Sequence, residues 1–370
     1  MSFLDDLEDT LKKELKEEVT FLFEDGDASD VKYFVSTGST LLDYIISNRR
    51  KGGIPVGKIT EISGLEGTGK SLLAMQICAE AVKMGGSAAF IDTEHAFSAE
   101  FAARVGLEEG SNFRVIRPSS VEGVFETLFK IVHSLDEKKK SKETDIPFFV
   151  FVWDSVAQTP CKADLDTENT DPTATVGLKP RILSKNIATL LGSVGRKNVA
   201  SVFLNQLRMN IGARPGQDKW VTPGGKAIPF ASSVRVRLAN AGKVKEKDAI
   251  RGINVKAKCV KTRFGPPYRE CNFPLYFTHG VDDWESIIDI LSNHDKVIKQ
   301  KGGRYGMMYR FADDPVEAKL PKLEFKKKLK TDSNLAEKAK KLLEEVMAVD
   351  LFDPDNAKIE IIVDDNAEVL

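Results

Sequence analysis

The chain has 370 residues, of which 42% are hydrophobic, and its 54 Lys and Arg residues nearly balance 55 Asp and Glu residues. This composition is typical of a folded globular protein, and no apolar run approaches the ~18 residues that a membrane-spanning helix needs. The four scattered cysteines form no C-x-x-C pair and the four histidines are dispersed, which excludes a disulfide framework and a zinc site.

The first predicted element is an amphipathic helix over residues 3–20, where leucines recur at three- and four-residue spacing. The segment is too short to fold alone, so its apolar face docks either on the chain's own core or on a neighbouring subunit. We therefore treat residues 1–33 as a docking segment. The acidic start lacks the basic-then-apolar layout of a signal peptide. A short helix over residues 41–46 follows, with Ser39 or Thr40 as its cap.

The stretch GLEGTGKS, from Gly64 to Ser71, anchors the chain. It follows an alternating apolar strand at residues 58–63 and opens an apolar helix at residues 72–84. In this context the pattern predicts a phosphate-binding loop, with Lys70 near the β- and γ-phosphates and the Ser71 hydroxyl on Mg²⁺; a chance Gly-rich turn is the alternative. The predicted nucleotide contacts of this loop are Gly64, Leu65, Glu66, Gly67, Thr68, Gly69, Lys70, Ser71 and Leu72.

Two apolar strands lead into acidic residues. The strand at residues 87–92 is followed by Glu94, and the strand at residues 147–153 ends at Asp154. Chemistry in open α/β sheets lies at the carboxyl ends of the strands. Glu94 is therefore a candidate general base for the water that attacks the γ-phosphate, and Asp154 a candidate Mg²⁺ ligand. The alternatives are that Glu94 caps the helix that begins near Ser98, and that Asp154 caps the next turn.

A further strand, at residues 199–204, leads to Gln206, a neutral amide where a γ-phosphate would be sensed. Residues 208–228 come directly after it, are Gly/Pro-rich, and combine basic residues with Trp220. This composition favours single-stranded nucleic acid, through phosphate pairing and base stacking, and γ-phosphate contact could order the loop; a plain surface loop is the alternative. The other elements predicted before this point are a strand at 113–116 and helices at 121–135 and 182–194.

Strands at residues 234–238, 253–260 and 270–277 predict a sheet that becomes antiparallel, and helices dominate after residue 282. Residues 235–263 carry ten basic residues and two acids, whereas both ends of the chain are acidic. A basic centre favours anion binding, with a solvated charged face as the alternative. The expected parts are a core at 34–280, a small C-terminal α/β domain at 281–349 and an acidic tail at 350–370.

Six motifs in order resemble the RecA recombinase family, its phage-type (UvsX-like) members included: GLEGTGKS, AAFIDTEHAF, FVFVWDSVAQTP, FLNQLRMNIG, TPGGKAIPFASSVRVRL and VKAKCVKTRFGPPY. The resemblance runs from about residue 34 to residue 280. It implies a RecA-like P-loop ATPase core, with a mostly parallel twisted sheet flanked by helices. It also implies a DNA-dependent ATPase that uses ATP and Mg²⁺, forms helical filaments on single-stranded DNA and exchanges strands with homologous duplex DNA. Its expected setting is the cytoplasm of a bacterial or phage-infected cell, with single-strand-binding and loader proteins as further partners.

The resemblance also implies roles for single residues. Lys261 and Arg263 would present two cations to the ATP of the next subunit, and Phe101 would lie near the adenine. Two departures stand out: residues 161–175 do not match the bacterial first loop, and Pro215 replaces an aromatic of the second loop. The DNA contacts that the resemblance and the loop composition imply are Arg181, Arg208, Asn210, Ile211, Arg214, Lys219 and Trp220.

Two other functions fit the same core. One is a hexameric RecA-like helicase motor, which would form closed rings and unwind duplexes directionally. The other is a nucleotide-switched scaffold that binds protein instead of DNA.

Overall fold

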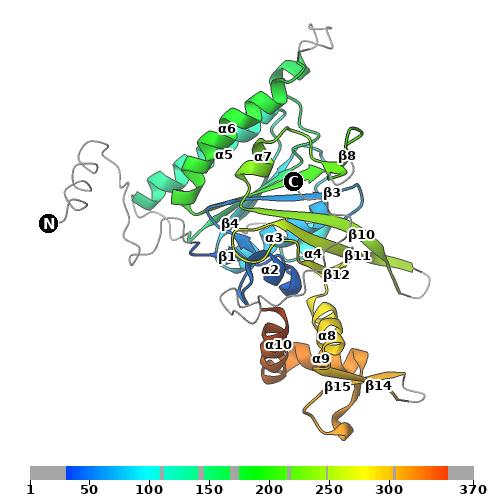
Figure 1. The fold of residues 1–370 in the computed structure, drawn as a ribbon. Helices are drawn as coiled ribbons and strands as arrows, with labels where there is room; N and C mark the ends of the chain where they lie inside the picture. The colour runs from blue at the N-terminus through cyan, green and yellow to red at the C-terminus, as the bar shows by residue number, and fades with distance from the viewer. Residues whose placement is uncertain are drawn as a thin grey trace, which may run out of the picture. The chain divides into compact units, whose positions relative to one another are not determined.

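A computed structural model of the chain describes residues 31–108, 112–140, 146–166, 175–214, 218–246, 249–302 and 306–348, and its elements carry the labels of Figure 1. The helix predicted at residues 3–20 and the acidic tail at 350–370 lie outside these ranges. Within them, no helix combines the length and the apolar character that crossing a membrane requires.

Among the described residues, a nine-stranded sheet runs in the order β13-β12-β11-β10-β3-β7-β6-β4-β5. The six strands from β10 to β5 are parallel, and β11 and β12 extend the sheet antiparallel, as predicted. The two-residue strand β13, which the sequence pattern did not reveal, pairs antiparallel with β12. The strands are β3 Ile59–Gly64, β4 Ser87–Asp92, β5 Phe113–Ile116, β6 Phe149–Asp154, β7 Val199–Gln206, β10 Val234–Glu246, β11 Ala249–Lys261, β12 Glu270–Tyr276 and β13 Gly280–Val281.

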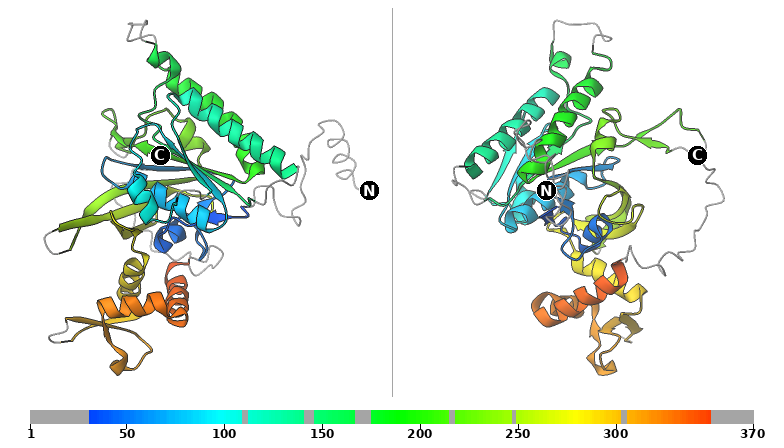
Figure 2. Two further views of the ribbon diagram at one scale, coloured as in Figure 1. Left: turned by 180° about the vertical axis from the view of Figure 1, so that it is seen from behind. Right: turned by 60° about the vertical axis from the view of Figure 1, so that its left-hand side comes forward.

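Helices cover both faces of this sheet (Figure 1, Figure 2). On one face, α5 Val121–Lys140 and α6 Leu178–Lys197 lie side by side, and α7 Ala227–Ala231 joins their hydrophobic cluster. On the other face lie α2 Thr40–Ser47, α3 Lys70–Lys83 and α4 Ala99–Arg104. The central strands are apolar along their whole length because both of their faces are covered. The RecA-like α/β layout that the motifs imply is therefore confirmed.

Strands β10 and β11 are longer than their sequence pattern predicts, at 13 residues each. The predicted parts place alternate side chains in the core, whereas residues 239–246 and 249–251 are mostly exposed and carry no apolar alternation. Figure 1 shows the pair projecting beyond the sheet as a hairpin. Hydrogen bonding between the two strands maintains this hairpin without a core beneath it.

The C-terminal elements contain strands that the sequence pattern did not reveal. A three-stranded antiparallel sheet accompanies three helices, and their buried side chains belong to the same hydrophobic cluster as α2 and α3. We propose a boundary near residue 281, where β13 ends. The elements are α8 Asp283–Asn293, β14 Val297–Lys301, β15 Met307–Phe311, β16 Leu320–Pro321, α9 Lys322–Thr331 and α10 Ser333–Met347.

The start of the described chain illustrates how buried acids are accommodated. Strands β1 Phe34–Val35 and β2 Ile54–Pro55 pair with each other near α2. The N-cap of α2 is Ser39, which is one of the two residues predicted for this position. Asp43 on α2 is buried and accepts hydrogen bonds from Ser36 Oγ at 2.6 Å and from Thr37 N and Oγ1 at 2.8 and 2.7 Å. Burial nevertheless raises the pKa of Asp43 to about 7 and that of Asp283, which Thr40 hydrogen-bonds, to about 6.

We expect these acids to make folding less favourable as pH rises. The folded protein holds their protons more tightly than the unfolded chain, so their contribution is complete below about pH 4 and is lost toward about pH 7. Relative to wild type, Asp43→Asn should gain on the order of 1–3 kcal/mol of unfolding free energy between about pH 4 and pH 8. Urea unfolding of both proteins across this range measures the difference. A difference that does not change with pH would contradict the assignment.

Candidate nucleotide-binding and DNA-binding site

The phosphate-binding loop connects β3 to α3, as predicted. Gly67 and Gly69 adopt left-handed backbone angles, with φ of 69° and 84°, which glycine reaches without strain. A Cβ on Gly64 would lie 2.5 Å from Thr68 Oγ1 and 2.8 Å from the Leu238 carbonyl oxygen, so the turn leaves no room for a side chain. The backbone conformation and the packing of this turn therefore require glycine at Gly64, Gly67 and Gly69.

Lys70 lies inside this loop. Its Nζ donates to the carbonyl oxygens of Gly64 at 3.1 Å and Leu65 at 2.8 Å. Burial lowers its pKa, and the carboxylates of Asp154, Glu94 and Glu66 oppose that shift. The Lys70 ammonium is thus held beside the loop by neutral carbonyl oxygens, which a charged phosphate oxygen could replace as the stronger hydrogen-bond acceptor.

A cleft of about 330 Å³ opens in front of the loop. Glu94, Asp154 and Gln206 reach it from the carboxyl ends of β4, β6 and β7, so the structure brings together residues that lie 112 positions apart. Ile253 and Phe277 close the cleft on the side of β11 and β12. Its described lining consists of Glu66, Gly67, Thr68, Gly69, Lys70, Ser71, Leu72, Glu94, Asp154, Gln206, Ile253 and Phe277.

Asp154 and Ser71 have the chemistry that Mg²⁺ prefers. Burial raises the pKa of Asp154 to about 6, against a hydrogen bond from the Ser71 side chain, and the nearby Glu94 carboxylate adds to the rise. In the described part of the chain, no three His, Cys, Asp or Glu side chains converge as a metal cage. Mg²⁺ keeps most of its coordination for water and substrate phosphates and takes few protein ligands.

Glu94 is exposed in the cleft, and its Oε1 accepts a hydrogen bond from Ser155 Oγ. Ser98 caps α4, because its Oγ accepts from the Phe101 amide at 3.1 Å. The alternative in which Glu94 caps this helix is therefore wrong. Capping of the next turn is not needed to explain the position of Asp154, because the Ser71 side chain donates a hydrogen bond to its carboxylate.

Phe101 does not reach the cleft of its own chain. It is 4% exposed and packs with the core cluster under α4, and it is absent from the described cleft lining. The sequence pattern missed Phe277, which is 46% exposed beside the loop. The signal that could have identified it is an aromatic residue at the end of the strand predicted at 270–277.

The second loop folds partly as a small hairpin, in which β8 Arg208–Met209 pairs with β9 Trp220–Val221. The amide of Asn210 donates to the Lys219 carbonyl oxygen at 2.9 Å. This pairing leaves Ile211 at the tip 96% exposed. Arg208, Arg214 and Lys219 are also exposed, and residues 215–217 lie outside the described ranges.

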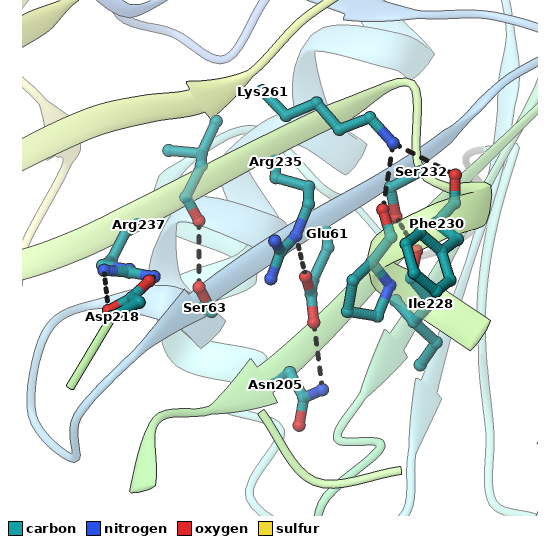
Figure 3. A network of polar contacts seen from close by, with 12 residues as sticks. Glu61, Ser63, Asn205, Asp218, Ile228, Phe230, Ser232, Arg235, Arg237 and Lys261 are labelled. Carbon is teal, nitrogen blue, oxygen red and sulfur yellow. Dashed lines mark hydrogen bonds and ion pairs between the residues drawn. The ribbon is translucent and has the colours of Figure 1, made fainter. Parts of the chain in front are cut away.

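Both ends of the second loop contact the nucleotide-binding strands. The Leu207 amide donates to the Gly64 carbonyl oxygen at 3.2 Å. Asn205 Nδ2 donates to the Pro223 carbonyl oxygen at 3.1 Å. It also donates to Glu61 Oε1 at 3.1 Å (Figure 3). Gln206 lies between Asn205 and Leu207 in the chain. A movement of Gln206 would therefore shift the contacts that hold both ends of the loop.

The far end of the second loop also packs on the start of α6, where Arg181 is exposed. A Cβ on Gly224 would lie 2.6 Å from Leu183 Cδ1, and one on Gly225 would lie 3.3 Å from Pro180 Cβ. The structure thus brings Arg181 next to the loop that carries the other predicted DNA contacts. Most of the unmatched first loop, residues 167–174, lies outside the described ranges.

Lys261 and Arg263 lie away from their own chain's cleft, since neither belongs to its described lining. Lys261 Nζ donates to the carbonyl oxygens of Pro229 and Phe230, each at 3.0 Å (Figure 3). Burial lowers the pKa of Lys261, and the cations Arg263 and Arg235 lower it further. A role on this chain's own nucleotide is therefore unsupported, whereas a role on a neighbour's nucleotide is compatible with this position.

Comparison with known proteins gives consistent matches. The family model described as the RecA N-terminal domain matches residues 4–282. The protein called Protein RecA from Dichelobacter nodosus is 35% identical over 282 residues, which cover 76% of this chain and 74% of that one. Those from Rhodopirellula baltica and from the Wolbachia of Brugia malayi are each 36% identical, over 277 and 256 residues. These alignments cover 74% and 69% of this chain and 69% and 67% of the relatives. With the phosphate-binding loop, the strand-end acids and the sheet order in place, the chain belongs to the RecA family.

Proposed function

We propose that the chain is an ATP-dependent homologous recombination protein. It forms filaments on single-stranded DNA and promotes pairing and strand exchange with homologous duplex DNA, with ATP bound between subunits. The observation that carries the proposal is the cleft in which the phosphate-binding loop meets Glu94, Asp154 and Gln206, with a basic, aromatic-bearing loop directly beyond Gln206. Family membership supports it independently.

Several cleft residues have roles in nucleotide binding and hydrolysis. Ser71 and Asp154 would hold Mg²⁺, which neutralises phosphate charge when bound. Lys70 exchanges its carbonyl partners for phosphate oxygens. Glu94 accepts a proton from the attacking water, and the Ser155 hydroxyl orients its carboxylate. Phe277, which is exposed at the rim of the cleft, supplies an apolar surface for the adenine base of ATP.

Gln206 couples this chemistry to DNA. A hydrogen bond from its amide to the γ-phosphate fixes the end of β7, and the neighbouring Asn205 and Leu207 hold the second loop through Pro223 and Gly64. Loss of the γ-phosphate removes that constraint. ATP therefore favours the ordered, DNA-binding arrangement of the loop, and hydrolysis releases it.

Fluorescence anisotropy of labelled oligo-dT and electron microscopy, with and without a non-hydrolysable ATP analogue, test the function together. We expect tight, strongly salt-dependent binding and helical filaments only with the analogue. Closed rings with directional unwinding would favour the helicase motor. A chain that ignores DNA under every nucleotide condition would favour the protein-binding scaffold.

For Lys261 we expect Lys261→Ala to leave ATP binding by the monomer unchanged and to reduce DNA-stimulated hydrolysis on the order of 10³-fold. Arg263→Ala should act in the same direction, and Lys130→Ala on α5 serves as the matched control. Mixing Lys261→Ala with Glu94→Gln distinguishes the trans role, because one subunit keeps an intact cleft and the other an intact Lys261. Activity of the mixture above that of either variant is expected; an inactive mixture would place Lys261 elsewhere in the mechanism.

A further inference from the structure

An ion pair joins the second loop to the central sheet. Arg237 on β10 donates through Nη2 to Asp218 Oδ2 at 2.7 Å and through Nη1 to Oδ1 at 3.3 Å (Figure 3). Asp218 Oδ1 also accepts from the Trp220 amide at 3.0 Å. A carboxylate is therefore held by a guanidinium fork within a loop whose other charged residues, Arg208, Arg214, Lys219 and Lys226, are all cations.

The two partners differ in exposure. The side chain of Asp218 is 56% exposed, whereas that of Arg237 is 21% exposed. Arg237 Nε is buried and has no hydrogen-bond partner among the described residues, so one donor of the fork is unused. The carboxylate thus covers a cation that a ligand from solvent could reach once Asp218 moves away.

The neighbouring arginine on the same strand face provides a contrast. Arg235 is two residues earlier, so its side chain emerges on the same side of β10. Its Nε donates to Glu61 Oε2 at 2.6 Å, and Glu61 is completely buried and also bonded by Asn205. That pair is structural, because a buried carboxylate without its cation is strongly destabilising. In the Asp218–Arg237 pair the carboxylate is exposed, so it can exchange its cation for water, and ion pairs that reach solvent are weak.

We propose that Arg237 is a further contact for the DNA backbone, and that Asp218 occupies the place of a phosphate on Arg237 when DNA is absent. A guanidinium fork binds carboxylate and phosphate with the same two-point geometry, so one replaces the other without loss of pairing. The displaced Asp218 is repelled by the phosphate, which breaks its hydrogen bond with the Trp220 amide. The inference rests on the proposed DNA-binding function and adds a residue and an exchange step to it.

The exchange makes opposite predictions for the two partners. Arg237→Ala should weaken oligo-dT binding about tenfold in the presence of a non-hydrolysable ATP analogue, and should reduce the slope of log K against log salt by about 0.7. Asp218→Asn should strengthen binding severalfold, because the cation is then available. Arg237→Lys, which keeps the charge without the fork, should fall between wild type and Arg237→Ala.

A matched ion pair on α5 provides the controls: Lys130→Ala and Glu126→Gln, whose side chains lie 2.7 Å apart. They change net charge as the test variants do and should leave affinity and salt slope near wild type. In the Arg237→Ala background, Asp218→Asn should no longer strengthen binding, which separates exchange from general charge repulsion. Retained binding of the ATP analogue verifies that each variant is folded.

Two results overturn the exchange. Weaker binding by both Arg237→Ala and Asp218→Asn would mean that the pair only pins the loop. Strengthening by Asp218→Asn that persists in the Arg237→Ala background would mean that Asp218 acts by repulsion alone. Failure of the wild-type chain to bind oligo-dT at all would instead remove the proposed function, and with it the DNA contact.

Discussion

Lys70→Ala is expected to abolish both ATP turnover and nucleotide-dependent assembly. Lys70 is the one cation in the described lining of the cleft, where it faces Glu66, Glu94 and Asp154. Without it, a triphosphate would meet three carboxylates and no compensating side-chain charge. We expect nucleotide affinity to fall at least about 10²-fold, because the loss combines a charge-assisted contact with uncompensated repulsion.

Titration with a fluorescent ATP analogue measures the affinity, and electron microscopy with single-stranded DNA detects the filaments. Lys83→Ala provides the control, since Lys83 lies at the other end of the same helix and its side chain is 76% exposed. The control should bind nucleotide and assemble as wild type does. Normal filaments from Lys70→Ala would show that assembly does not depend on this cleft.

The centre of the fold was predictable because its signals are local. A buried parallel strand is an uninterrupted apolar run, and the first polar residue after it marks the carboxyl edge of the sheet. Glu94, Asp154 and Gln206 each follow such a run within two residues, and the phosphate-binding loop indicates which polar residues at that edge to choose. Their convergence in one cleft then follows from the parallel order of β3, β7, β6 and β4, which places all these strand ends on the same edge.

The residues that the pattern missed depend on contacts between distant segments. A Cβ on Gly69 would lie 2.6 Å from Leu275 Cδ2 and 3.2 Å from Ile253 Cδ1, so β11 and β12 pack directly over the phosphate-binding loop. This packing brings Ile253 and Phe277 to the cleft, and no local pattern in either strand encodes it. Phe101 shows the converse, because an aromatic that the family motif places near adenine here fills the core under α4.

The pairing of Asp218 with Arg237 was hidden for the same reason. By composition, residues 208–228 are a polar, Gly/Pro-rich loop, and nothing in that composition distinguishes an acid that pairs with the sheet from one in solvent. Likewise, the exposed half of the β10–β11 hairpin has no apolar face, so its strands carry no period-two signal. Sequence patterns report burial well, and they report polar partners poorly.

The second large effect is expected for Glu94→Gln, which should retain ATP, Mg²⁺ and DNA binding while hydrolysis falls about 10³-fold. The amide has nearly the same shape as the carboxylate and can still accept the hydrogen bond from Ser155 Oγ. It cannot take a proton from water, and a positioned general base typically contributes about 10²- to 10⁴-fold in rate. Single-turnover hydrolysis with saturating DNA isolates this step from product release.

The retained binding makes this variant informative about the coupling as well as the chemistry. If γ-phosphate contact at Gln206 maintains the ordered second loop, a chain that cannot hydrolyse ATP should remain on DNA far longer than wild type, with ATP as effective as the non-hydrolysable analogue. Glu100→Gln on α4 is the control, since Glu100 is exposed and pairs only with the exposed Arg104 among the contacts described for it. Turnover by Glu94→Gln at the control's rate would place the base elsewhere, and rapid dissociation without turnover would separate DNA release from hydrolysis.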